Sequence, residues 1–420
     1  MADEREKSML NEREKVMSNV RQKTIPQLRN IAIGAGLIAS LAVLLVAERS
    51  LERVALAQAK TTEQVPIYEV DPMWPKTLPN TWVIGNVIGV AVDAQDNVWI
   101  IHRPHSLTPN EIPKNQTPPT GEDCCMAAPP ILAFNQAGNL VRNWGPIHLA
   151  QKPEAGPDWP DAEHGIFVDY NNNVWIGGGG DGMSKTDRAI YKFSVDGKLI
   201  KRFGEKGPVY NSNDTANLGQ PADINVDRAT NEVWVADGYR NKRVIVMDAN
   251  TGAYKRHFGA YGNKPDDAPA NYDPKGPPSK QFRSPVHCVL FSNDGLVYIC
   301  DRGNDRIQVF KHDGTFVKEQ FIAKNTLSAG SVWDIGFSID PQQQFLFLAD
   351  GINHKVRILR RSDLMEVSSF GHQGRWPGGF YAAHSLAVDS KQNIYIGETW
   401  EGKRVQRFLY KGMGNRRPTN

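Results

Sequence analysis

The stretch HGIFVDYNNNVWIGGG, residues 164–179, contains the pattern that decides the fold. An apolar alternating segment leads into an Asp-x-x-x-Asn turn, and a second apolar segment with a central Trp follows the turn. Alternation with a period of two, interrupted by Asn, Asp and Gly, is typical of a β-hairpin.

The same pattern recurs five more times along the chain. The other copies are GVAVDAQDNVWIIHR (89–103), ADINVDRATNEVWVADG (222–238), HCVLFSNDGLVYICDRG (287–303), WDIGFSIDPQQQFLFLADG (333–351) and HSLAVDSKQNIYIGE (384–398). Each of the first five hairpins is followed by a second one, such as IYKFSVDGKLIKRFG (190–204) with Asp-Gly at its turn. Four strands in each of six repeats predict an all-β, six-bladed β-propeller over residues 65–412.

The last repeat is one strand short. After its first hairpin only KRVQRFLYKG (403–412) remains, whereas VPIYEV (65–70) is a spare strand before the first repeat. We expect the spare strand to complete the last blade, so that the ring has no free edge.

The N-terminus is organised differently. A polar segment, residues 1–30, precedes the uncharged run IAIGAGLIASLAVLLVA at 31–47, which we expect to be a transmembrane anchor or a signal segment. Arg21, Lys23 and Arg29 before the run predict a cytoplasmic N-terminus. Cleavage after Ala57-Gln58-Ala59 is the alternative to an uncleaved anchor. In both cases the linker (48–64), the propeller and the tail (413–420) are expected outside the cytoplasm, membrane-anchored or secreted.

Composition narrows the function classes. The net charge is only +3, from 49 basic and 46 acidic residues, which argues against a nucleic-acid partner. Four cysteines are too few for a disulfide-based scaffold.

Three histidines occupy one slot of the repeat. His164, His287 and His384 each stand eleven residues before the aromatic residue of the next strand. The corresponding positions of the other repeats hold Ile88, Ala222 and Trp333. Because inner strands line the channel of a propeller, histidines on alternate blades are expected to converge as a three-nitrogen site for zinc or another divalent transition metal. The other histidines, which include His105 and His148, do not recur at an equivalent position of the repeats, and the sequence assigns no function to them.

Three polar side chains are expected next to the histidines. Arg103 and Arg302 each stand four residues after the blade aromatic, and Tyr239 follows the same turn in the third repeat. Arginine offers a fork for a carboxylate, and a tyrosine beside a divalent cation can act as a base. Each residue alone is equally compatible with an ion pair or a packed ring.

The repeats resemble NHL repeats through the pattern apolar-Asp-x-x-x-Asn-x-Val-Trp/Tyr-Ile. The segments HRPH, EHGIFVD, VADGYRNKRV, VHCVLF, CDRGNDRIQVF and AHSLAVD are similar to those of peptidyl-α-hydroxyglycine α-amidating lyases. The resemblance implies that His164, His287 and His384 bind zinc, that Tyr239 is catalytic, and that Arg103 and Arg302 line the active site. It also implies cleavage of a carbinolamide with a carboxylate, a small molecule or a peptide C-terminus, into an amide and glyoxylate.

The chain departs from that family at several positions. Ser385 replaces an aspartate that helps to hold a structural calcium, so calcium is in doubt, and Arg240 replaces a disulfide cysteine. Simple strand register places Cys288 and Cys300 on opposite faces, so no bond is predicted between them, and Cys124-Cys125 could pair only as a vicinal ring. Two other functions stay open: a non-catalytic binding platform, and a metal-dependent hydrolase or lactonase of the six-bladed superfamily.

Overall fold

The computed structural model describes Arg49 and residues 64–149, 156, 158–179, 186–204 and 211–415. The predicted anchor at 31–47 lies outside these residues. Within them, no helix has both the length and the apolar character needed to cross a bilayer.

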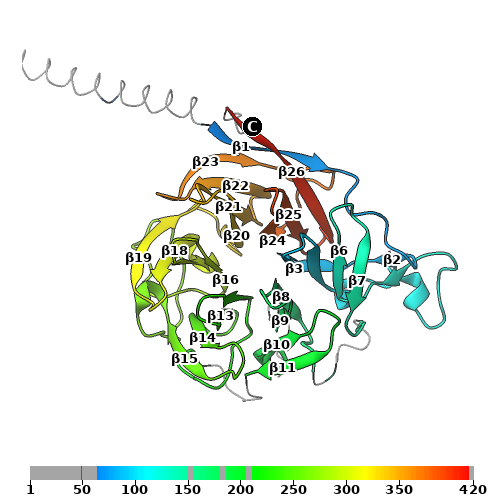
Figure 1. Ribbon diagram of the computed structural model, residues 1–420, viewed down its shortest axis with the longest axis horizontal. Helices are drawn as coiled ribbons and strands as arrows, with labels where there is room; N and C mark the ends of the chain where they lie inside the picture. Colours follow the sequence, from blue (N-terminus) through cyan, green and yellow to red (C-terminus); the bar gives the residue numbers. More distant parts are fainter. Residues whose placement is uncertain are drawn as a thin grey trace, which may run out of the picture. The chain divides into compact units, whose positions relative to one another are not determined.

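Six four-stranded antiparallel sheets are arranged radially as the blades of a propeller, which confirms the predicted fold (Figure 1). From the innermost strand outward, blade 1 contains β3 (Asn86–Val92), β4 (Val98–Arg103), β6 (Ile131–Phe134) and β7 (Leu140–Trp144), and blade 2 contains β8 (Glu163–Val168), β9 (Val174–Gly178), β10 (Ile190–Phe193) and β11 (Leu199–Phe203). In the same order, blade 3 contains β12 (Asp223–Asp227), β13 (Glu232–Asp237), β14 (Arg243–Asp248) and β15 (Tyr254–Phe258), and blade 4 contains β16 (Val286–Phe291), β17 (Leu296–Asp301), β18 (Arg306–Lys311) and β19 (Phe316–Phe321). Blade 5 contains β20 (Asp334–Phe337), β21 (Phe345–Asp350), β22 (Lys355–Arg360) and β23 (Met365–Phe370), and blade 6 contains β24 (Ala383–Val388), β25 (Ile394–Glu398), β26 (Arg404–Asn415) and β1 (Gln64–Asp71). An insert in blade 1 adds the short parallel pair β2 (Trp82–Val83) and β5 (Met126–Ala127).

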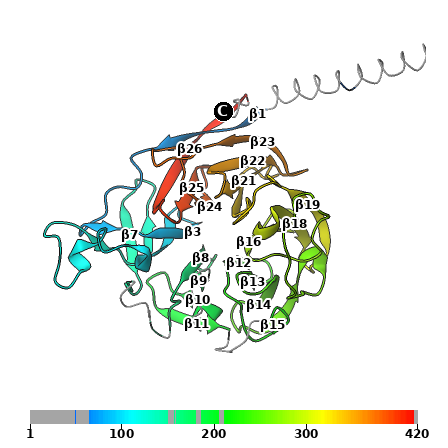
Figure 2. The same ribbon diagram turned by 180° about the vertical axis from the view of Figure 1, so that it is seen from behind.

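The ring closes through the N-terminal strand, as expected from the missing strand of the last repeat. β1 pairs antiparallel with β26, from Gln64 opposite Asn415 to Asp71 opposite Arg407. Figures 1 and 2 show the two strands side by side at the outer edge of blade 6. Val65 is fully buried, so this strand belongs to the core of the ring.

The repeat pattern has a direct physical cause. Asp93 in blade 1 accepts a hydrogen bond from the backbone N–H of Asn97 at 2.8 Å and another from Trp99 Nε1 at 2.9 Å. Asp169 in blade 2 and Asp389 in blade 6 repeat this arrangement with Asn173 and Trp175, and with Asn393 and Tyr395. One carboxylate therefore both closes the hairpin turn and satisfies the polar atom of the large buried ring.

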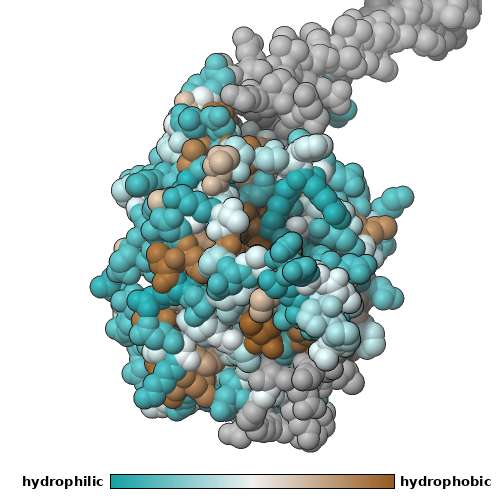
Figure 3. Space-filling view, turned by 90° about the vertical axis from the view of Figure 1, so that its right-hand side faces the viewer, coloured by the Kyte–Doolittle hydropathy of each residue, from teal (hydrophilic) through white to brown (hydrophobic). Residues whose placement is uncertain are grey.

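The apolar core lies between neighbouring blades. Trp99 and Ile101 of blade 1 pack in one cluster with Ile176 of blade 2, and similar clusters join the later blades. On the side of the propeller shown in Figure 3, hydrophilic residues prevail and exposed apolar ones form separate patches.

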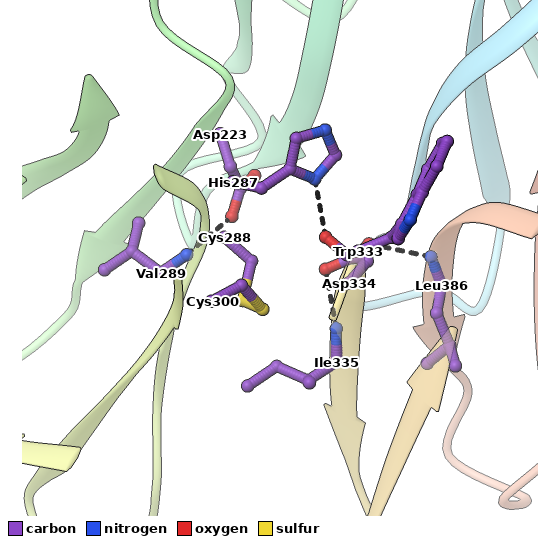
Figure 4. The surroundings of a disulfide bond; sticks show 9 residues. All are labelled: Asp223, His287, Cys288, Val289, Cys300, Trp333, Asp334, Ile335 and Leu386. Carbon is purple, nitrogen blue, oxygen red and sulfur yellow. Dashed lines mark hydrogen bonds between the residues drawn. A yellow bond between two sulfur atoms is a disulfide. The ribbon is translucent and has the colours of Figure 1, made fainter. Parts of the chain in front are cut away.

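All four cysteines are paired, Cys124 with Cys125 and Cys288 with Cys300. The expectation that Cys288 and Cys300 stay apart was wrong. The hairpin register runs without a break from Phe291 opposite Val297 to Cys288 opposite Cys300, with 4.8 Å between the two cysteine Cα atoms. Residues directly opposite each other in an antiparallel pair point to the same face, so the two sulfur atoms meet, as Figure 4 shows.

Candidate metal centre and active site

The three slot histidines converge in the channel. Their ring centroids lie 5.2 Å apart for His164 and His287, 5.0 Å for His164 and His384, and 4.9 Å for His287 and His384. One ring nitrogen of each lies within 4.8 Å of the others, and all three residues are buried. The alternate-blade placement therefore brings together three potential nitrogen ligands.

Bulges in the inner strands accompany all three histidines. The register shifts between His164 and Ile166, between Val286 and Cys288, and between Ala383 and Ser385. In blade 2 the bulged residue is Gly165, with φ +61°, where a Cβ would lie 2.7 Å from the carbonyl oxygen of Ala222. Glycine is needed there because only it combines this conformation with such close packing.

Hydrogen bonds fix the tautomer of two of the imidazoles. His164 Nδ1 donates to the carbonyl oxygen of Ala222 at 2.6 Å, and His287 Nδ1 donates to that of Trp333 at 2.5 Å. Burial holds the pKa of each of the three imidazoles well below its ordinary value; the charge of Arg302 adds to the effect at all three, and that of Arg103 at His164 and His384. The rings are therefore neutral, which is the form that binds metals.

The remaining nitrogens fit a cation. Tyr239 Oη lies 2.9 Å from His164 Nε2 and 3.1 Å from His287 Nε2. Both nitrogens present lone pairs, but the hydroxyl has a single proton and can donate to only one of them. A divalent cation would satisfy all the converging lone pairs, and the backbone carbonyls behind His164 and His287 act as the outer shell typical of metal-binding histidines.

Tyr239 reaches the histidines because of the residues before it. Asp237 is fully buried and its Oδ2 accepts a hydrogen bond from Arg243 Nε at 2.9 Å. Gly238 then packs so closely on β16 that a Cβ would lie 2.0 Å from the carbonyl oxygen of Val286. The Asp-Gly-Tyr segment thus anchors the turn, brings it against the strand that carries His287, and directs the tyrosine into the channel.

The structure also places both predicted arginines at this cavity. Arg302 Nη1 donates to Tyr239 Oη at 3.3 Å, and the Arg302 guanidinium stacks 3.6 Å from the ring centroid of Trp333. Arg103 Nε and Nη2 donate to the carbonyl oxygens of Glu163 and Gly179 at 2.9 and 2.5 Å. Backbone carbonyls therefore hold the second guanidinium at the rim of the histidine cluster.

Apart from His287, these side chains line one cavity of about 250 Å³ together with residues not assigned to the site from the sequence. The additional lining residues are Asn86, Ile88, Thr399, Trp333 and Trp400. Trp333 occupies the histidine slot of blade 5, and Thr399 stands four residues after Tyr395, as Arg302 does after Tyr298. The alignment that indicated the arginines could therefore have indicated both, whereas Trp400 follows no repeat position.

Two partly buried carboxyl groups line the channel beside the histidines. Asp223 of blade 3 accepts the backbone N–H of Val289 at 3.0 Å, and Asp334 of blade 5 accepts that of Leu386 at 2.7 Å (Figure 4). Burial raises the pKa of both carboxyl groups. Both carboxyl groups line a small cavity beside the histidines, and Ser385 lines it too. Ser385 stands where the lyase family that the sequence resembles has an aspartate that holds calcium. Each carboxyl group links its own blade to the next one.

The chain is similar to several known proteins at low sequence identity. No family model matches the chain. It is 26% identical over 375 residues to human NHL repeat-containing protein 3, covering 86% of this chain and 88% of that protein. It is 27% identical over 285 residues to peptidyl-glycine alpha-amidating monooxygenase B of Xenopus laevis, covering 63% of this chain and 28% of that protein. It is 25% identical over 242 residues to the probable peptidyl-alpha-hydroxyglycine alpha-amidating lyase of Caenorhabditis elegans, covering 56% of this chain and 60% of that protein.

The chain thus spans little more than a quarter of the length of the Xenopus relative and most of the human one. The identities are low, at 25–27%. The chain is a six-bladed β-propeller whose homologues include NHL repeat-containing protein 3, peptidyl-glycine alpha-amidating monooxygenases and a probable peptidyl-alpha-hydroxyglycine alpha-amidating lyase.

Proposed function

We propose that the propeller is a zinc-dependent carbon–nitrogen lyase that cleaves a carbinolamide, N–CH(OH)–COO⁻, into an amide and glyoxylate. The observation that carries the proposal is the meeting of three neutral imidazoles, the Tyr239 hydroxyl and the Arg302 guanidinium in one cluster. The name of the Caenorhabditis elegans relative supports this reaction class.

His164, His287 and His384 would hold the ion, with zinc or another divalent transition metal fitting three imidazoles. A bound ion would lower the pKa of the substrate hydroxyl by acting as a Lewis acid.

Tyr239 would transfer the proton. Its oxygen lies at the mouth of the histidine cluster, where, as a phenolate that a bound cation would favour, it can accept the hydroxyl proton as the C–N bond breaks. The electron pair of the C–N bond stays on nitrogen, and a C=O bond forms at the carbon. Return of the proton from Tyr239 to nitrogen completes the amide, so no other reactant is needed.

The arginines would recognise the negative charge of the substrate. Arg302 uses Nε for the carbonyl oxygen of Ala329 and Nη1 for Tyr239, so its Nη2 is the nitrogen left to bind a carboxylate. Arg103 would stabilise the charge that develops on the substrate oxygen.

A non-catalytic binding platform is the second candidate, because the similarity to NHL repeat-containing protein 3 covers 86% of the chain. We also propose that the propeller lies outside the cytoplasm, attached by residues 31–47. The pairing of all four cysteines supports this location, since disulfides persist in oxidising compartments. A reporter fused after Asn420 that is active only in the cytoplasm would exclude it.

The lyase proposal is tested with the zinc-loaded full chain and α-hydroxyhippurate. We expect release of glyoxylate, and Tyr239→Phe should lower kcat by about 10²–10⁴ because it removes only the proton-transferring hydroxyl. Metal content, measured by mass spectrometry, should not change. Tyr170→Phe, at a half-exposed ring on blade 2, is the matched control and should keep full activity.

A zinc-loaded wild type that forms no glyoxylate would exclude the lyase function and favour the binding platform. Full activity of Tyr239→Phe would remove the tyrosine from the mechanism.

A further inference from the structure

A second group of metal-ligating side chains lies outside the channel cluster. His105 belongs to the single turn η1 (Pro104–Ser106), His148 follows blade 1, and Glu163 begins β8. One ligand atom from each residue lies within 4.8 Å of the others. Glu163 precedes His164, and neighbouring side chains of a strand point to opposite faces, so this group faces away from the channel.

The individual distances are short. His105 Nδ1 lies 3.0 Å from His148 Nε2 and 3.6 Å from Glu163 Oε2, and His148 Nδ1 lies 3.4 Å from Glu163 Oε1. Ligands at 2.0–2.1 Å from a tetrahedral zinc are separated by about 3.3–3.4 Å. The contacts of Glu163 with the two imidazoles, at 3.6 and 3.4 Å, are close to this spacing, and one ligand atom of each residue lies within 4.8 Å of the others.

The group is deeply buried and incompletely hydrogen-bonded. The side chain of Glu163 is fully buried, that of His148 is 3% exposed, and that of His105 is 21% exposed. Glu163 Oε1 accepts a hydrogen bond from Trp159 Nε1 at 3.0 Å. Glu163 Oε2 and His148 Nδ1 make no hydrogen bond with the described part of the chain. Two unsatisfied polar atoms at one buried point are costly unless something else binds them.

The tautomer of His148 directs a lone pair toward Glu163. His148 Nε2 lies 3.0 Å from the carbonyl oxygen of Asp161, so this nitrogen carries the proton of a neutral ring that donates to it. The lone pair on Nδ1 then faces the carboxyl group of Glu163, 3.4 Å from Oε1.

We propose that His105, His148 and Glu163 bind a second divalent transition-metal ion, separate from the ion of the histidine channel. Two imidazoles and one carboxylate form a ligand set that suits zinc and leaves a coordination position open. The proposal does not depend on the lyase function.

Such an ion would also position Arg103. The carbonyl oxygen of Glu163 accepts the Nε hydrogen bond of Arg103, and His105 is two residues after Arg103 in the chain. An ion held by His105 and Glu163 would join the two segments that fix this guanidinium.

The test is the number of zinc ions per full-length chain after loading and removal of excess metal, measured by mass spectrometry. We expect two ions in the wild type and one in His148→Asn, Glu163→Gln and His384→Ala. The double variant His148→Asn/His384→Ala should bind none. Asp187→Asn, at a buried carboxyl group beside the cluster that is not a ligand, is the matched control and should keep both ions.

Glu163→Gln retains an oxygen for Trp159, so it separates loss of a ligand from loss of packing. If His148→Asn does not fold, His105→Asn at the partly exposed ring provides the same measurement. A single ion in the wild type, or an unchanged count in the cluster variants, would overturn the proposal. Two ions in a chain without lyase activity would support it and reject only the proposed reaction.

Discussion

Arg302 shows how much of the site depends on the identity of one residue. Its guanidinium is buried, stacks on Trp333, donates Nε to the carbonyl oxygen of Ala329 at 2.7 Å, and donates Nη1 to Tyr239. Burial lowers its pKa, yet arginine stays charged at neutral pH. A planar fork can stack and donate in several directions at once, which a lysine ammonium cannot do.

Arg302→Lys should therefore lower kcat/KM of the proposed lyase by about 10- to 100-fold, because hydrogen bonds to charged groups contribute about 1.5–3 kcal/mol. Steady-state kinetics with α-hydroxyhippurate measure this. Arg228→Lys, at an exposed arginine beside Tyr170, is the control and should leave kcat/KM unchanged. Wild-type kinetics in Arg302→Lys would show that the fork and the stacking contribute nothing.

At the scale of the element, the later blades share an ion pair between the second strand and the start of the third. The pairs are Asp237–Arg243 at 2.9 Å, Asp301–Arg306 at 2.7 Å, Asp350–Arg357 at 2.8 Å and Glu398–Arg404 at 2.6 Å. All four carboxyl side chains are fully buried. Each pair therefore fixes the tight connection between two strands at the end where the channel residues lie.

Strand β22 offers a matched comparison of a buried and an exposed pair. Arg357→Met keeps the apolar stem but leaves Asp350 buried without its partner, so it should reduce the free energy of unfolding by about 3–5 kcal/mol. Arg360→Met removes the pair with Asp363, whose side chains are 42% and 45% exposed, and should cost at most about 1 kcal/mol. Urea unfolding of both variants measures the difference.

The cost of Arg357→Met should depend on pH. Burial already raises the pKa of Asp350, and loss of the arginine raises it further. The buried charge is present above that pKa and disappears when the carboxyl group binds a proton, so the deficit should shrink as pH falls. Equal losses in the two variants at neutral pH would contradict the structural importance of the buried pair.

At the scale of the whole molecule, stability depends on closing the ring. β1 supplies the outer strand of blade 6, and Tyr68 packs against Phe347 and Phe370 of blade 5 at centroid distances of 5.6 and 5.3 Å. The first strand of the propeller is thus joined to the last blade and to its neighbour. Detaching it would expose the edge of β26.

Val65→Asp places a charge at a fully buried position of this closing strand and should destabilise the entire propeller by at least about 3 kcal/mol. Calorimetry should show a lower unfolding temperature, and light scattering should show aggregation through the free edge. Glu69→Gln, on the same strand but with a side chain that is 68% exposed, is the control and should unfold like the wild type. Identical unfolding of the two variants would mean that closure by β1 is dispensable.

Much of the fold could be read from local patterns. Hairpins, turns and blade count follow from alternation and from the Asp-x-x-x-Asn turn, because these interactions join residues a few positions apart. The positions of His164, His287 and His384 also followed from the repeat, because equivalent positions in a ring of blades face one axis.

Only the tertiary structure decided the rest. The bulge at His287 depends on packing around the channel and leaves no mark in the alternating pattern. The contact of Arg302 with Tyr239 and the meeting of His105, His148 and Glu163 join residues from different blades and inserts. The sequence by itself determined which residues form strands and which slots face the axis, because both follow from short-range periodicity. The register shifts and cross-blade contacts follow instead from how complete blades pack against one another.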